Sequence, residues 1–159
     1  MKQTIAVGDL PALDWVNFLL ADVKDGLGPF LAIFLMSSQH WDATHIGVIM
    51  TIAGIATVVA RVPAGALVDR TVWKRGLIAT AAGAVAAGAI VLSLFPQFWP
   101  AAAAQTLIGA CDAIFPPAIT AISLGIVGRR AFTGRVGRNE AFNHAGNAFT
   151  AIMAGIAGY

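Results

Sequence analysis

Charged residues are scarce in this chain of 159 residues. Eight acids and ten bases make up 11% of the sequence, whereas soluble domains carry about a quarter of their residues as Asp, Glu, Lys and Arg. Hydrophobic residues reach 58%, and the mean hydropathy is +0.77. So few charges cannot solvate the surface of a water-soluble fold of this size. The composition therefore predicts a protein whose natural solvent is lipid.

Cysteine is almost absent, and other chemical signatures are missing too. The one cysteine, Cys111, lies in an apolar stretch, which excludes a disulfide framework and a cysteine-based metal site. The bases form short clusters rather than a long basic face, so nucleic acid is not an expected partner. We find no nucleophile with a base, no phosphate-binding loop and no metal-ligand cluster. We therefore expect no enzymatic activity, no cofactor and no bound metal.

Long apolar runs dominate what is present. None of them alternates as a strand would, and each is long enough for a membrane-spanning helix of about 20 residues. The five predicted spans are residues 15–36, 46–68, 76–95, 99–127 and 141–159. Pro29, in the first run, and the pair Pro116 and Pro117, in the fourth, are expected to bend or break their helices. The fold class predicted is an all-α integral membrane protein with five transmembrane helices.

The distribution of basic residues predicts the orientation of these helices. Eight of the ten bases lie before the first span, between the second and third, or between the fourth and fifth: Lys2, Arg70, Lys74, Arg75, Arg129, Arg130, Arg135 and Arg138. The other two connections contain no Lys or Arg. Because basic loops stay on the cytoplasmic side, we expect a multi-pass protein of the cell membrane with a cytoplasmic N-terminus. The lipid bilayer is its first expected partner.

The connection between the second and third spans carries a recognisable motif. Gly65, Leu67, Asp69, Arg70, Lys74 and Arg75 follow one another at the spacing of a signature loop. This segment resembles the loop of the major facilitator superfamily, with Val72 where that family has a second glycine. A small residue at Gly65 allows close helix contact, and Asp69 near the start of the next helix can interact with its positive end.

The resemblance implies an architecture and a function. Members of this superfamily have two six-helix bundles with the substrate between them, and they work by alternating access. The chain is similar to the amino-terminal portion, about five of twelve helices, so we expect a fragment that lacks the sixth helix and the second bundle. Gly65, Asp69, Arg70, Lys74 and Arg75 would form the gating loop. The expected function is secondary transport of a small solute, with protons as a candidate coupling ion.

A different class of function stays open from the sequence. A small membrane protein without transport activity, acting by helix packing against a partner, or an inactive truncated product, would also carry these spans. The resemblance implies an Arg in the fourth helix of many proton-coupled members, and Gln105 stands at that position. The missing charge weakens the expectation of proton-driven antiport, although Gln105 can hydrogen-bond a substrate or a helix. The fifth helix lacks the Gly-Pro signature of the family's drug antiporters, so drug antiport is not supported.

Two acids interrupt the first span. Asp22 and Asp25 are three residues apart and would share a helix face near the bilayer centre. Two close carboxylates at low dielectric cannot both ionise cheaply, which makes them candidates for carrying a proton. Lys24 offers a second interpretation, because as an internal counter-ion it could turn the group into a structural pair.

Polar residues in the fourth and fifth spans complete the candidates. The spacing of Glu140, Asn143, His144 and Asn147 predicts one polar stripe on the last helix. His144 beside Glu140 suits proton transfer and the two Asn amides suit a substrate, whereas interhelical hydrogen bonding, with Glu140 capping the helix start, is the structural alternative. Asp112 would line the cavity or pair with another helix. We interpret Arg61 as a structural partner of an acid.

Overall fold

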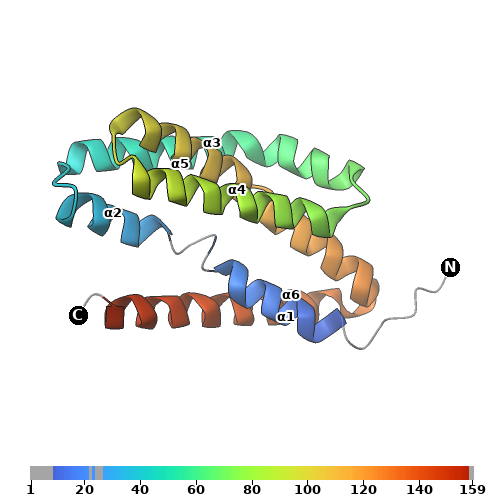
Figure 1. Ribbon diagram of the computed structural model, residues 1–159. Coiled ribbons are helices and arrows are strands. Elements are labelled where there is room, and N and C mark those ends of the chain that lie inside the picture. The colour runs from blue at the N-terminus through green and yellow to red at the C-terminus, as the bar shows by residue number, and fades with distance from the viewer. Residues whose placement is uncertain (1–8, 22, 24–26, 158–159) are drawn as a thin grey trace. The chain divides into compact units, whose positions relative to one another are not determined.

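The computed structural model describes residues 9–21, 23 and 27–157, with the side chains of residues 9, 27–30 and 157 left out (Figure 1). Six helices follow one another in this part of the chain: α1 (Asp9–Ala21), α2 (Leu27–Ser37), α3 (Ala43–Arg70), α4 (Lys74–Leu94), α5 (Phe98–Asp112) and α6 (Phe115–Ala157). The described residues form no strand, which confirms the predicted all-α class.

The helices fall into two compact units. The first unit joins the residues up to 26 with residues 119–159, so that α1 lies beside α6, and the second comprises residues 27–118. Within the second unit α5 packs against both α3 and α4, and α2 contacts α3 (Figure 1). Connections of a few residues separate α3, α4 and α5. Such short connections make sequence neighbours run antiparallel.

Prolines stand in the first turns of two helices. In the first predicted span α1 ends at Ala21 and α2 begins at Leu27, with Pro29 in its first turn, and residues 22 and 24–26 lie outside the described residues. In the fourth span α5 ends at Asp112, and α6 begins at Phe115 with two prolines directly after it. A proline in the first turn of a helix removes an N–H that has no intrahelical acceptor. In the fourth span the helix therefore restarts at its prolines instead of bending around them.

Small residues allow the helices of the second unit to approach closely. A Cβ atom at Gly109 on α5 would lie 2.4 Å from the carbonyl oxygen of Ala53 on α3. A Cβ at Gly88 on α4 would lie 2.8 Å from Cγ1 of Ile108 on α5. Because real Cβ atoms do not come this near to other atoms, only glycine fits at these two crossings. The small-residue pattern of the sequence thus has a packing role.

A kink at Gly128 divides α6. The backbone there has φ 68° and ψ 174°, in the middle of residues that are otherwise helical. Glycine adopts this combination without the steric cost that a side chain would add. The second part of α6 is helical from Arg129 onward, before the predicted fifth span begins at Ala141. Residues 129–140, expected as a loop, are helical, and Arg135 and Arg138 among them pair with Asp14 on α1.

The helices have the length and surface of membrane spans. Among the described residues, α3, α4 and the stretch Phe98–Ile156, which contains α5 and α6, are long and apolar enough to cross a bilayer, and Leu10–Ala21 is a shorter apolar helix. Large apolar side chains remain exposed along them, including Val62 at 81% and Trp99 at 79%. A soluble protein hides such side chains. Their exposure is what a lipid-facing surface requires.

Candidate functional site

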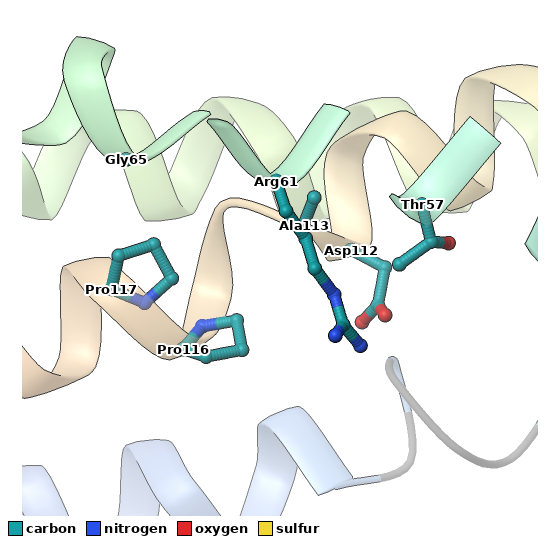
Figure 2. Close-up of a pocket in the computed structure, with 7 residues that line it drawn as sticks. All are labelled: Thr57, Arg61, Gly65, Asp112, Ala113, Pro116 and Pro117. Atoms are coloured by element: carbon teal, nitrogen blue, oxygen red, sulfur yellow. The ribbon is translucent and has the colours of Figure 1, made fainter. Parts of the chain in front are cut away.

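A pocket of about 440 Å³ opens within the second unit. Side chains of α3, α5 and the first turn of α6 line it: Thr57, Arg61, Gly65, Asp112, Ala113, Pro116 and Pro117 (Figure 2). The interruption between α5 and α6 forms one wall, so the break in the fourth predicted span creates part of the space. This volume lies in the range of pockets that hold small molecules.

Two ionisable residues face this pocket from different helices. Figure 2 shows Arg61 reaching into it from α3 and Asp112 from the end of α5. Asp112 was predicted to line a cavity or to pair with another helix. It lines the pocket, and it also has an interaction within the chain. Arg61, interpreted from the sequence as the partner of an acid, forms no hydrogen bond or ion pair with any residue that the structure describes.

A hydrogen bond of Thr57 limits which hydrogen-bonding groups the pocket wall can offer to a ligand. The Thr57 hydroxyl donates to the carbonyl oxygen of Ala53 at 3.0 Å, so its oxygen is left as an acceptor. At Gly65 no atom of the described residues lies within 4 Å of the place a Cβ would take. The close helix contact expected at Gly65 is therefore absent within this part of the chain, and the glycine instead leaves room in the pocket wall.

The signature loop is organised by a lysine. Asp69 and Arg70 lie in the last turn of α3, so Asp69 does not stand at the start of the next helix as expected. The Lys74 ammonium group donates to the carbonyl oxygens of Val68 at 2.9 Å and Thr71 at 2.7 Å. These oxygens have no partner within α3, and a cation is favourable at the negative end of a helix. Lys74 therefore fixes the turn that joins α3 to α4.

A buried ion-pair network connects α1 to α6 within the first unit. Asp14 accepts one hydrogen bond from Nη2 of Arg135 at 2.6 Å, and Arg138 donates to both of its carboxylate oxygens, the shortest contact being 2.7 Å. Asp14 is 4% exposed and Arg135 5% exposed. The Arg138 side chain is 60% exposed and lies over the ring of Phe142. A buried carboxylate with two guanidinium partners is well compensated.

Two further residues extend the network across the kink in α6. Nε of Arg135 donates to Oδ1 of Asn139 at 2.7 Å, and Nδ2 of Asn139 donates to the Ser123 hydroxyl at 2.8 Å. All three side chains are buried. The hydrogen bonds thus hold the part of α6 after Gly128 against the part before it.

Sequence analysis missed this network. Arg135 and Arg138 were assigned only to the basic loop that sets orientation, and Asp14 was not singled out. The available signal was an acid directly before the first span together with Arg135 and Asn139 four residues apart, which places both on one helix face. Nothing in the sequence shows that Asp14 lies opposite that face.

The predicted polar stripe on the last helix is divided by the structure. Glu140 and His144 are exposed, and Asn143 and Asn147 are half-buried. Asn147 has an interaction within the chain. Glu140 lies inside α6 rather than at its start, so the alternative in which it caps the helix is wrong. The face that meets α1 carries Gly146, where a Cβ would lie 2.2 Å from the carbonyl oxygen of Phe18.

The remaining candidates lie elsewhere. Gln105 is 5% exposed in the middle of α5 and does not line the pocket. Asp22, Asp25 and Lys24 lie outside the described residues, so the predicted proton-carrying pair stays a prediction. No group of three or more His, Cys, Asp or Glu side chains that could hold a metal ion occurs in the part of the chain that the structure describes.

Comparison with known proteins identifies the family to which the chain belongs. The family model described as Major Facilitator Superfamily matches residues 14–159. Two proteins of Mycobacterium tuberculosis, from strains CDC 1551 / Oshkosh and H37Rv, are each named an uncharacterized MFS-type transporter and are 49% identical to the chain over 148 residues. The match covers 93% of the chain and 35% of each relative. The chain therefore spans about a third of the length of these relatives. No solved structure matches significantly.

Proposed function

Because the chain belongs to the major facilitator superfamily, we propose that it is part of a secondary transporter that moves a small solute across a membrane by alternating access. The match of the family model over residues 14–159 carries this proposal. The pocket of about 440 Å³ supports it, since charged side chains at membrane depth commonly mark a solute path. The chain itself is a multi-pass membrane protein with apolar helices suited to lipid.

Five spans with a cytoplasmic N-terminus in the cell membrane are part of the proposal. The bases that predict this orientation include Arg70, Lys74 and Arg75 at the end of α3 and start of α4, where Lys74 closes the turn. A phosphatase reporter that is active only outside the cytoplasm tests it. Fused at the N-terminus it is expected to be inactive, whereas activity there would contradict the orientation.

Solute uptake into proteoliposomes tests transport itself. The full reading frame that encodes this chain is reconstituted, the vesicles are incubated with the small-molecule fraction of a cell extract, and accumulated solutes are identified by mass spectrometry. We expect at least one solute to accumulate above protein-free vesicles and to saturate with concentration. Accumulation equal to that of protein-free vesicles would overturn the proposal and favour a membrane protein that acts by helix packing.

Proton coupling is a finer part of the proposal, with Asp22, Asp25, Asp112 and His144 as the candidate carriers. An imposed pH gradient is expected to drive accumulation in the native protein and to fail in the Asp25→Asn variant, because an amide cannot release a proton. Unchanged pH-driven accumulation in the variant would remove Asp25 from the proton path and leave His144 and Asp112 as the next residues to substitute.

A further inference from the structure

Arg61 lies at a depth where an ionised side chain is costly. It stands nine residues before the end of α3 at Arg70, which corresponds to about 13 Å along the helix at a rise of about 1.5 Å per residue. The 28 residues of α3 exceed the length that a hydrocarbon core of about 30 Å requires. With the core centred on α3, Arg61 falls inside it. A charge there needs a partner, water or a ligand.

The rest of the chain shows how other arginines are compensated. Arg135 and Arg138 share the carboxylate of Asp14 in the first unit. Arg61 has no such contact with a described residue, and instead its side chain reaches into the pocket (Figure 2). The guanidinium is thus available to a molecule that enters the pocket.

The chemistry of the pocket walls identifies the class of that molecule. A guanidinium offers a planar set of N–H donors that matches a carboxylate or a phosphate group. Thr57 contributes an acceptor because its own hydrogen is given to Ala53. Asp112 also lines the pocket, and its acidic side chain disfavours a second negative group on the solute.

From this arrangement we propose that Arg61 binds the oxyanion group of the transported solute, a small molecule with a single carboxylate or phosphate group. The proposal rests on the transport function proposed above and adds the class of substrate. Pro116 and Pro117, which follow the break between α5 and α6, line the same pocket as Arg61, and the absence of a side chain at Gly65 leaves room in its wall.

The identity of the solutes that accumulate in proteoliposomes tests the proposal first. The native protein is expected to accumulate a solute with one carboxylate or one phosphate group, and mass spectrometry tells these two apart. Accumulation of only uncharged or cationic solutes would overturn the role of Arg61 as an anion site and leave transport standing. Absence of any accumulation would overturn transport, and this proposal with it.

Variants of the arginine provide the second test. For the solute that accumulates, Arg61→Gln is expected to raise the KM by about tenfold or more, because a charge-assisted hydrogen-bonded pair is lost. The KM of Arg61→Lys is expected to lie between that of the native protein and that of Arg61→Gln. Arg130→Gln removes an arginine that is exposed on α6 and serves as the matched control with native KM. An unchanged KM in Arg61→Gln would overturn the proposal. If that variant fails to insert, Arg61→Lys and the identity of the native solute still decide.

Discussion

At the scale of single residues, four charged side chains of the described residues illustrate three different environments. Asp14 and Arg135 are buried and paired with each other, Arg61 faces a pocket, and Lys74 caps a helix. Sequence reasoning singled out Arg61, Lys74 and Arg135 but not Asp14, and it could not assign the environments of any of them. The reason is physical, because burial and pairing depend on which helix lies opposite, and residues 14 and 135 are far apart along the chain.

Loss of Asp14 should cost more stability than loss of Arg138. Asp14→Ala leaves the buried Arg135 without its carboxylate, so we expect the free energy of unfolding to fall by about 3 kcal/mol. Arg138→Ala removes a partner whose side chain is 60% exposed and should cost less than about 1 kcal/mol. Denaturant unfolding in detergent measures both. Equal losses of unfolding free energy would show that the buried pair of Asp14 and Arg135 is no stronger than the exposed pair of Asp14 and Arg138.

The carboxyl group of Asp42 makes the stability of the folded protein depend on pH. It precedes α3, outside the apolar spans, and its hydrogen bond with the His45 ring lowers the pKa of its carboxyl group below the usual value. A group with a lowered pKa in the folded state stabilises the fold fully above its unfolded pKa, and that contribution is lost as the pH falls through the folded pKa.

The variant Asp42→Asn isolates this effect. We expect it to unfold at a lower temperature than the native protein at neutral pH, and the gap to narrow as the solution is acidified below the ordinary carboxyl pKa. Thermal unfolding followed by circular dichroism at several pH values measures the gap. A gap of constant size would mean that the Asp42 charge contributes nothing to stability.

At the scale of helices, hydrophobic runs predicted where the chain is helical far better than where helices stop. The apolar stretches of α3 and α4 are evident from hydropathy alone, and their residues form long helices. The helical stretch from Arg129 was missed because its polar side chains resemble a loop, although Arg135 and Asn139 are buried by packing. The position of the kink at Gly128 depends on a backbone conformation that many glycines could adopt.

The close crossing of α3 and α5 leads us to expect different stability changes when glycines inside and outside it are substituted. Gly109→Ala places a Cβ against the carbonyl oxygen of Ala53, so we expect a loss of about 1–3 kcal/mol from overpacking between α3 and α5. Gly54→Ala adds a methyl group to α3 where nothing lies within 4 Å, and it should be neutral or stabilise by up to about 1 kcal/mol. Unfolding in detergent compares the two. Equal effects of the two substitutions would contradict the tight crossing.

At the scale of the whole molecule, the sequence motif and the family match indicate the same architecture. Neither of them locates the pocket, which only the structure reveals. The resemblance pointed to a transporter through Gly65, Asp69 and Arg70, and the family match extends it over residues 14–159. Apart from Gly65, the pocket is formed by residues that the motif does not contain, chiefly Arg61, Thr57 and those at the break before Pro116. Such a break creates a cavity that hydropathy cannot detect.

Site-directed labelling tests the proposed alternating access through this pocket. Thr57→Cys in a Cys111→Ala background of the full reading frame places one thiol in the pocket wall. Right-side-out and inside-out vesicles are then treated with a membrane-impermeant maleimide. If the proposed transport cycle is right, we expect labelling from both faces of the membrane, because the pocket would open to each side in turn. Labelling from one face alone would contradict it.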